Sequence, residues 1–448
     1  MENNNTLRIS IFFDGTGNNA KNAYEREKKG NVTPKTGGSY DISPTNIYRL
    51  FCNLEQNQND TKKALYIEGI GTFEGLVDST MSAATGFDIW DGYDASAKTS
   101  KAFQAVEKVI ADFNPLPSTG NVCLKFDLFG FSRGAALARN FANILQSDQI
   151  KKDRIKTILN DKNQKLEAIE FGFIGLFDTV ESIIYPPKVV HFNLDLAAIK
   201  ADCIFHLAAL HECRENFPLT SVIQNNSGTT SPNLDEQGSR CNTINNTYEL
   251  FVPGAHSDVG GGYNACQDEN ATINDDATYT REGAKKLVEH ITEVNPVFLP
   301  LLSSIQYEFE TLSAGFNAIS KRKNVHGHLQ LLYAKLMAVT AQKFGVPFDL
   351  QVFDVNHTIP NDLIPYYEKL SDSSQALIES KKFKALHHEL TPELVQKYVH
   401  ISVSTRTIMG KEEEVETGPL LKSTTAARGG VYIVNRPAND WKRKIISL

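Results

Sequence analysis

The sequence predicts an α/β fold in which a mostly parallel sheet is flanked by helices, and three observations lead to this prediction. Short β-type runs alternate with helical patterns through the first 263 residues. Several of these runs end in glycine-rich or acidic turns. One run passes through Gly130-Phe131-Ser132-Arg133-Gly134 directly into an alanine-rich helical stretch. A chain of 448 residues, of which 41% are hydrophobic, is long enough to bury the core that such a fold requires.

Five runs have the composition of strands and are followed by turn residues. These expected strands are residues 7–13, 65–67, 122–129, 169–177 and 248–252. Helical patterns lie between several of them, at residues 101–113, 135–146 and 194–212. The carboxyl ends of parallel strands share one edge of the sheet, and ligands bind at that edge. We therefore expect the turns that follow the five runs to meet there.

The motif around Ser132 is typical of a nucleophile elbow, a tight turn from a strand into a helix. The residues that flank the serine must be small, and Gly130 and Gly134 occupy the two flanking positions. Such a turn lifts the hydroxyl to the carboxyl edge of the sheet, above a helix N-terminus. The alternative interpretation is an ordinary Gly-Ser surface turn at the start of a helix.

A serine hydroxyl is a strong nucleophile only when a base accepts its proton and a carboxylate orients that base. Asp178 directly follows an expected strand, and His256 follows the last of the five. Ser132, Asp178 and His256 therefore occur in the chain order that α/β-hydrolases use. Two alternatives stay open. Asp178 could be a helix N-cap, and His400 could be the base, since this histidine usually comes near the end of an α/β-hydrolase chain.

The oxyanion that forms on an attacked carbonyl needs preorganised N–H donors. The N–H of Arg133 is one candidate, because this residue follows the serine. We expect the second donor in the turn after the first strand, at Gly15 or Thr16. Asp14 would orient this turn or pair with Arg133, and the alternative is an Asp-Gly turn that only ends the strand.

Five motifs carry a resemblance to a known family. They occupy residues 12–19 (FFDGTGNN), 69–72 (GIGT), 130–135 (GFSRGA), 177–180 (FDTV) and 253–263 (PGAHSDVGGGY). Together they resemble the α/β-hydrolase domain family that includes the type VI secretion phospholipase effectors of the first lipase-effector group. The resemblance implies that Ser132, Asp178 and His256 form a catalytic triad. It also implies that the substrates are acyl esters of glycerophospholipids.

The resemblance further implies partners and a place of action. The protein would be made in the bacterial cytoplasm without a signal peptide and exported by a type VI secretion apparatus to act on target-cell membranes. A secretion spike and an immunity protein are the protein partners that the resemblance implies. A Ser-His-Asp cycle needs no cofactor and no metal, so we expect neither.

We expect three parts in the chain. Residues 1–263 would form the α/β-hydrolase catalytic core, and residues 264–397 a helical extension that acts as a lid or a membrane-docking subdomain. Residues 398–448 would contain strands that return to the core, at residues 399–405 and 431–434. The apolar segment 296–302 could belong to a lid, but simple packing of a helical subdomain onto the sheet is the favoured alternative.

Composition argues against several other classes of protein. A formal net charge of −7 argues against nucleic-acid binding, which requires a basic face. No run approaches 18 consecutive apolar residues, and the first residues lack the basic start and apolar centre of a secretory signal. The 6 cysteines form no C-x-x-C pair, so we expect reduced thiols rather than a zinc site or a disulfide framework.

Two other functions stay open from the sequence. Asp14, Asp178, His256 and Asp258 could converge as ligands of a divalent cation in a metal-dependent hydrolase. In the serine-hydrolase interpretation, Asp14 and Asp258 only support the catalytic residues. A hydrolase-like fold without catalysis could also serve as a binding module of a secretion system.

Overall fold

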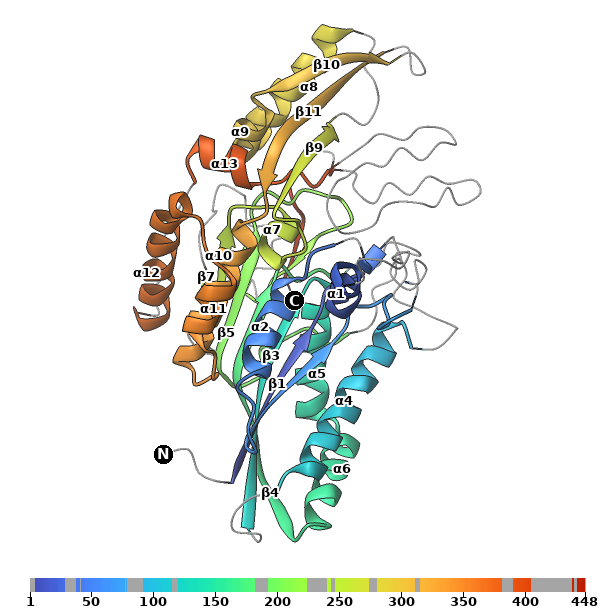
Figure 1. The fold of residues 1–448 in the computed structure, drawn as a ribbon, viewed down its shortest axis with the longest axis vertical. Helices are drawn as coiled ribbons and strands as arrows, with labels where there is room; N and C mark the ends of the chain where they lie inside the picture. Colours follow the sequence, from blue (N-terminus) through green and yellow to red (C-terminus); the bar gives the residue numbers. More distant parts are fainter. Residues whose placement is uncertain are drawn as a thin grey trace.

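The computed structural model places a long twisted sheet at the centre of the molecule, with helices on both of its faces (Figure 1). It describes residues 5–28, 38–40, 42–76, 78, 92–114, 120–181, 192–223, 240–242, 246–273, 280–310, 315–380, 390–403, 437–438 and 441–447.

The central sheet has seven strands in the order β2-β1-β3-β4-β5-β8-β7, and all neighbouring pairs are parallel except β7 with β8. The strands are β1 (Thr6–Phe13), β2 (Lys62–Ile67), β3 (Gly120–Phe131), β4 (Gln164–Phe177), β5 (Ala201–Ala209), β7 (Arg240–Asn242) and β8 (Thr247–Val252). The α/β fold with a mostly parallel sheet is therefore confirmed, and the five expected strands correspond to β1, β2, β3, β4 and β8.

Strand β1 shows how one run of residues serves both faces of the sheet. Leu7, Ile9 and Ile11 belong to the apolar core on one face, whereas Phe12 belongs to the core on the other. This alternation follows from the two-residue period of a strand. Neighbours on both sides and helices on both faces leave β1 buried, which explains its mostly apolar composition.

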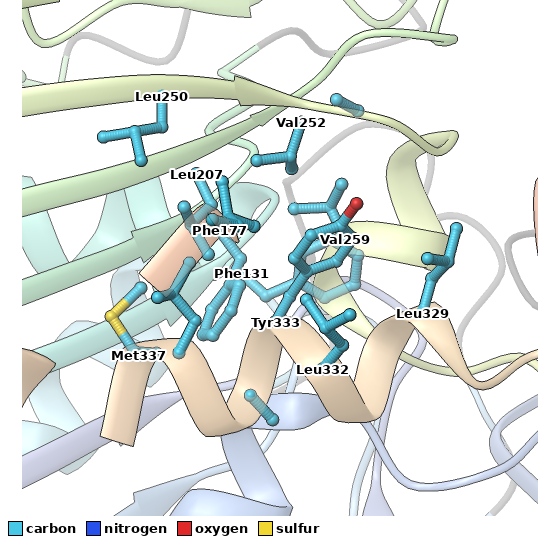
Figure 2. Close-up of a cluster of buried hydrophobic side chains, with 14 of the residues drawn as sticks. Phe131, Phe177, Leu207, Leu250, Val252, Val259, Leu329, Leu332, Tyr333 and Met337 are labelled. Carbon is cyan, nitrogen blue, oxygen red and sulfur yellow. The ribbon is translucent and has the colours of Figure 1, made fainter. Parts of the chain in front are cut away.

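Helices cover each face of the sheet (Figure 1). One face carries α4 (Ala95–Asp112), α5 (Arg133–Ser147) and α6 (Gln149–Asn160), and the other carries α2 (Asn46–Glu55), α10 (Leu329–Lys343) and α11 (Leu350–Asn356). Figure 2 shows how α10 packs: Tyr333 points from this helix toward Val252 and Val259, and its hydroxyl donates to the carbonyl of Pro253. Met337 belongs to the same buried cluster as Phe131 and Phe177, at the ends of β3 and β4. A helix from the second half of the chain therefore covers the sheet beneath the end of β3.

Strand β5 corrects one expectation. The sequence pattern predicts a helix at residues 194–212, but Ala201–Ala209 is a strand between β4 and β8. Cys203 and Phe205 face the core on one side, and Ile204 faces the core on the other. A strand that is buried on both faces is a continuous apolar run without alternation, and periodicity does not distinguish such a run from a buried helix.

The extension at 264–397 is not entirely helical, which corrects the expectation of a helical insertion. It contains a three-stranded antiparallel sheet in the order β10-β11-β9. Its strands are β9 (Cys266–Thr272), β10 (Ile305–Glu310) and β11 (Gly315–His326), and its other elements besides α10 and α11 are α8 (Arg281–Val294), η3 (Pro296–Phe298), α9 (Leu299–Leu302), η4 (Asn361–Leu363), α12 (Ile364–Ser380) and α13 (Pro392–Tyr398). In the apolar segment 296–302, Phe298, Leu301 and Leu302 are buried in the core and Leu299 is exposed, which favours the packing interpretation.

The end of the chain returns to the first half of the molecule. Strand β12 (Ile445–Ile446) pairs in parallel with β6 (Leu219–Thr220) in a separate two-stranded sheet. The strand expected at 399–405 is absent over residues 399–403, and residues 404–405 and 431–434 lie outside the described residues. The remaining elements are α1 (Ala20–Lys28), η1 (Gly38–Tyr40) and α7 (His256–Gly260).

Within the described part of the chain, no helix has the length and apolar character needed to span a membrane. The five cysteines whose side chains the structure describes, at positions 52, 123, 203, 213 and 266, are free thiols.

Candidate active site

Ser132 lies in the turn between β3 and α5, at the carboxyl edge of the sheet. Its backbone has φ 57° and ψ −127°, a conformation that L residues rarely adopt. A Cβ on Gly130 would lie 2.5 Å from the Cα of Ala135, so the turn closes too tightly for a side chain there. The Ser132 N–H donates to the carbonyl of Phe177 (3.1 Å), which joins the ends of β3 and β4. The strained, tightly packed turn has the geometry of a nucleophile elbow.

The loop after β1 packs directly against this turn. A Cβ on Gly134 would lie 2.3 Å from the carbonyl oxygens of both Phe13 and Asp14, and a Cβ on Gly15 would lie 2.7 Å from the ring of Phe131. The two glycines therefore let the backbone of the loop approach both sides of Ser132. This contact places the loop where an oxyanion donor is needed.

The two expected donors in this loop differ in the structure. The N–H of Gly15 already donates to the Asp14 carboxylate (2.8 Å). The N–H of Thr16 donates to no described residue, and its buried hydroxyl also lacks a hydrogen-bond partner among them. Thr16 is therefore the better of the two candidates. Arg133 is the first residue of α5, so the helix itself supplies no acceptor for its N–H.

Asp14 holds the loop and does not pair with Arg133. Besides Gly15, its carboxylate accepts hydrogen bonds from the hydroxyls of Thr45 (2.6 Å) and Tyr66 (2.6 Å). Burial raises the pKa of Asp14 to about 6, although these hydrogen bonds oppose the shift. Of the two roles expected for Asp14, orientation of the turn is the one that the contacts support.

Asp178 and His256 form a fully buried hydrogen-bonded pair. The Nδ1 atom of His256 lies 2.5 Å from Oδ2 of Asp178. Burial alone would raise the pKa of Asp178, but Arg443 and His256 outweigh this effect and hold its pKa well below the usual value. Because Asp178 is ionised, Nδ1 carries the proton and donates it, and Nε2 is left with a lone pair. Burial also lowers the pKa of His256, which its contact with Asp178 only partly offsets, so the imidazole is neutral at neutral pH.

The third link of a triad is not formed in the structure. Nε2 of His256 is buried and has no hydrogen-bond partner among the described residues, so it does not contact the Ser132 hydroxyl. The imidazole nevertheless lies next to the elbow, since its ring centre is 4.6 Å from that of Phe131. Ser132 and His256 are only 3% and 0% exposed, so the site is closed to solvent.

His400, the alternative base, has an aspartate partner of its own. Its Nδ1 lies 2.7 Å from Oδ1 of Asp258, and its backbone N–H donates to Oδ2 of the same residue (2.9 Å). Its ring stacks on Tyr263, with ring centres 3.7 Å apart. Oδ2 of Asp258 also accepts from the N–H of Ala255, directly before His256. These contacts make Asp258 a support for the His256 segment and leave His256 as the histidine that packs against the elbow.

The structure does not bring the proposed metal ligands together. Asp14 is bound to Thr45 and Tyr66, whereas Asp258 is bound to His400. Both oxygens of Asp178 face a guanidinium, which would repel a cation. Among the residues that the structure describes, no group of three or more His, Cys, Asp or Glu side chains has the arrangement of a metal site. The alternative of a metal site at Asp14, Asp178, His256 and Asp258 is therefore wrong for this conformation, because each carboxylate has a different partner.

Sequence reasoning missed several polar residues that hold the site. Arg443 binds Asp178, and Glu212 accepts a hydrogen bond from the backbone N–H of His256 (3.4 Å). Behind Asp178, Nε2 of His206 accepts from the N–H of Thr179 (3.1 Å). Arg443, Glu212 and His206 lie outside the five motifs. Arg443 lies in a short basic segment near the end of the chain, and such segments are usually interpreted as solvent-exposed surface.

Comparison with known proteins adds a family and a related fold. The family model described as "T6SS, Phospholipase effector Tle1-like, catalytic domain" matches residues 7–158 and 146–280, which together are more than half of the chain. No curated protein matches the sequence.

Two solved structures are similar to this one. The "Structure of the Tle1 effector bound to the VgrG spike from the Type 6 secretion system" is 23% identical, with a TM-score of 0.67 over 99% of this chain and 94% of that one. At this identity the likeness shows the fold. The "Crystal structure of an uncharacterized protein from Pseudomonas aeruginosa" is 18% identical, with a TM-score of 0.43 over 87% of this chain and 52% of that one.

The raised pKa of Asp14 predicts a pH-dependent stability. Between pH 4 and 6 the carboxyl ionises in the unfolded chain but stays protonated in the folded one, so the free energy of unfolding falls as the pH rises through this range. Asn does not titrate. We expect the free energy of unfolding of the wild type, relative to Asp14→Asn, to fall by about 2 kcal/mol between pH 4 and 7. Denaturant titrations of both proteins at several pH values measure this difference, and a constant difference would contradict the prediction.

Proposed function

The chain belongs to the Tle1-like family of T6SS phospholipase effectors, whose catalytic domain it contains, and on this premise we propose that it hydrolyses the acyl esters of glycerophospholipids with Ser132, His256 and Asp178. The family supports a hydrolase. The choice of these three residues rests on the geometry of the site.

The observation that carries the proposal is the orientation of His256. Its Nδ1 is held by an ionised carboxylate, and its Nε2 lone pair is buried without a partner next to the residue that precedes Ser132. An imidazole in this state is a general base that lacks only its proton donor. A movement at the elbow that brings the Ser132 hydroxyl to Nε2 would complete the triad, and such contacts often tighten only when substrate binds.

The proposed reaction has two steps. The Oγ atom of Ser132 attacks the ester carbonyl carbon while its proton passes to Nε2 of His256, and the imidazolium then protonates the leaving alcohol. The lysophospholipid departs and the acyl group stays on Ser132. In the second step, water attacks the acyl-serine, its proton passes to His256, and the fatty acid is released as Ser132 regains its proton.

Two backbone N–H groups are suited to bind the oxyanion of each step. One belongs to Arg133 at the start of α5, and the other to Thr16 in the loop that packs against the elbow. Donors held in place before the reaction stabilise the developing charge without reorganisation, and the loss of one typically lowers the rate about 10²- to 10³-fold.

Access to the site requires a change in the structure. Ser132 is almost completely buried, so an acyl chain reaches it only when part of the surrounding chain is displaced. We propose that contact with a lipid surface favours this opening. A role of residues 264–397 as a lid or membrane-docking subdomain, next to the catalytic core at 1–263 and the returning segment at 398–448, belongs to the same proposal.

The family and the related fold also support a route of delivery. The similar structure is described as an effector bound to the VgrG spike of a type VI secretion system. We propose that this chain is likewise carried by a VgrG-type spike to the membranes of a target cell, and that an immunity protein protects the cell that makes it.

Replacing Ser132 tests the nucleophile. We expect Ser132→Ala to lower kcat by about 10⁶ on phospholipid vesicles, as loss of the nucleophile does in subtilisin, without loss of folding. Released fatty acid, identified for each member of a lipid-ester panel, measures the activity and the preferred substrate. A fluorophosphonate probe should label the wild type at Ser132 in the presence of a chelator. A folded wild type that neither releases fatty acid nor reacts with the probe would support the alternative of a binding module without catalysis.

The two buried histidines offer a matched pair of variants. Asn in place of either histidine keeps a donor for the aspartate partner but removes the base. We expect His256→Asn to lower kcat by roughly 10⁴ to 10⁶ and His400→Asn to lower it by less than about tenfold, since only His256 packs against the elbow. The same fatty-acid assay, with circular dichroism to confirm folding, measures both. Loss of activity in His400→Asn alone would reverse the assignment of the base.

Binding to the spike is tested with a purified VgrG protein from the bacterium that makes this chain. We expect the two proteins to elute together in size-exclusion chromatography, and Ser132→Ala to bind as the wild type does, because the buried serine offers no contact surface. Separate elution of the two proteins at micromolar concentration would contradict the proposed route.

A further inference from the structure

Asp178 is held between two partners that lie far apart in the sequence. His256 contacts Oδ2, whereas Nη1 and Nη2 of Arg443 donate to Oδ1 and Oδ2 at 2.6 and 2.9 Å. Oδ1 also accepts from the N–H of Ala209 (2.8 Å). All three charged or ionisable side chains are at most 3% exposed. The carboxylate therefore has a complete set of hydrogen bonds in which Arg443 supplies two.

The backbone of the C-terminal segment fixes the position of Arg443. The carbonyl of Lys444 accepts from the N–H of Leu219 (2.8 Å), and the carbonyl of Trp441 accepts from Nδ2 of Asn295 (2.7 Å). The guanidinium itself donates through Nε to the carbonyl of Phe217 (2.8 Å). Contacts on both sides of Arg443 thus aim its planar group at Asp178.

We propose that Arg443 is a positioning residue of the hydrolytic site, which fixes the plane of the Asp178 carboxylate against His256 and balances its charge. The proposal rests on the proposed function, and it makes the last residues of the chain a part of the active site.

The positioning argument follows from the shape of the guanidinium. Two parallel N–H donors bind both oxygens of a carboxylate and so fix its rotation, which a single point charge does not do. Without this fork, Asp178 would keep only the N–H of Ala209 and its contact with His256. A catalytic carboxylate that rotates no longer holds the imidazole in one orientation, and the rate falls.

The charge argument concerns the ionised groups, among the described residues, that lie next to His256 or bind its partner Asp178. Asp178 and Glu212 are negative, whereas Arg443 and Arg214 are positive, and Arg214 binds Glu212 at 2.7 Å. These four charges add up to zero around a neutral imidazole. Removal of the Arg443 charge would leave one net negative charge in this group. His256 would then bind a proton more tightly. With Arg443 present, His256 therefore stays unprotonated down to a lower pH than it would beside Asp178 alone. In this state it can accept a proton from Ser132.

The test uses three full-length variants and two measurements. Arg443→Gln removes the charge and the fork, Arg443→Lys keeps the charge without the fork, and Lys444→Gln removes an exposed charge from the same segment as the matched control. The imidazole of His256 is titrated by NMR, with its signal identified by its loss in His256→Asn. The kcat and KM for a phospholipid ester are measured across pH for each folded variant.

We expect the pKa of His256 and the acidic limb of kcat/KM to move up by more than about 0.5 units in Arg443→Gln, because Arg443 would no longer balance the negative charge of Asp178 next to His256. Arg443→Lys should keep both within about 0.5 units of the wild type but lower kcat about tenfold or more at unchanged KM. Lys444→Gln should match the wild type.

Two results would overturn the inference: a folded Arg443→Gln in which His256 titrates as in the wild type, or an Arg443→Lys with wild-type kcat. If Arg443→Gln does not fold, the kcat of Arg443→Lys decides whether Arg443 positions the Asp178 carboxylate. The NMR titration does not depend on any activity. A wild type that hydrolyses no ester therefore refutes the proposed function, while the titration of His256 in Arg443→Gln still decides the charge role of Arg443.

Discussion

The buried carboxylate of Asp178 is the point on which the arrangement of the site depends. Asp178 follows the end of β4, and its carboxylate joins this point to the end of β5, the start of α7 and the C-terminal segment through hydrogen bonds to Ala209, His256 and Arg443. A buried carboxylate is tolerated only when it is fully paired, because removal from water costs several kcal/mol. The pairing therefore requires the end of the chain to return across the molecule, and in doing so it gives His256 a defined tautomer.

Close backbone contacts at the sheet edge complete this arrangement. The loop after β1 packs on Gly134 and Phe131, and the ends of β3 and β4 are joined through the Ser132 N–H. The parallel sheet brings these ends together, and the glycines remove the side chains that would separate them. The consequence is that Ser132 and His256, the proposed nucleophile and base, are both buried. The proposed reaction therefore requires loops that hold the site closed and also let the substrate enter.

Two Asp–His pairs each draw one member from the short segment 256–258 but have different structural settings. The pair formed by His256 and Asp178 packs against the elbow, whereas the pair formed by His400 and Asp258 holds the segment before α7 and stacks on Tyr263. Asp258 thus connects the two, since it binds His400 and caps the turn that presents His256. In the proposed function, the Asp–His unit at His256 serves as a base and the one at His400 as a support, and only their neighbours distinguish the two uses.

The sequence by itself determined the parallel sheet, the elbow at Ser132 and the strand-end positions of Asp14 and Asp178, because each depends on a short run of residues and its turn. Only the tertiary structure decided that residues 201–209 form a strand, that Asp14 binds Thr45 and Tyr66, and that Arg443 binds Asp178. A strand that is buried on both faces shows no alternation of polar and apolar residues. The sequence around Arg443 likewise contains no signal that identifies its partner 265 positions away. Local patterns encode turns and periodicity, whereas the pairing of buried charges is settled by which parts of the chain the completed fold brings into contact.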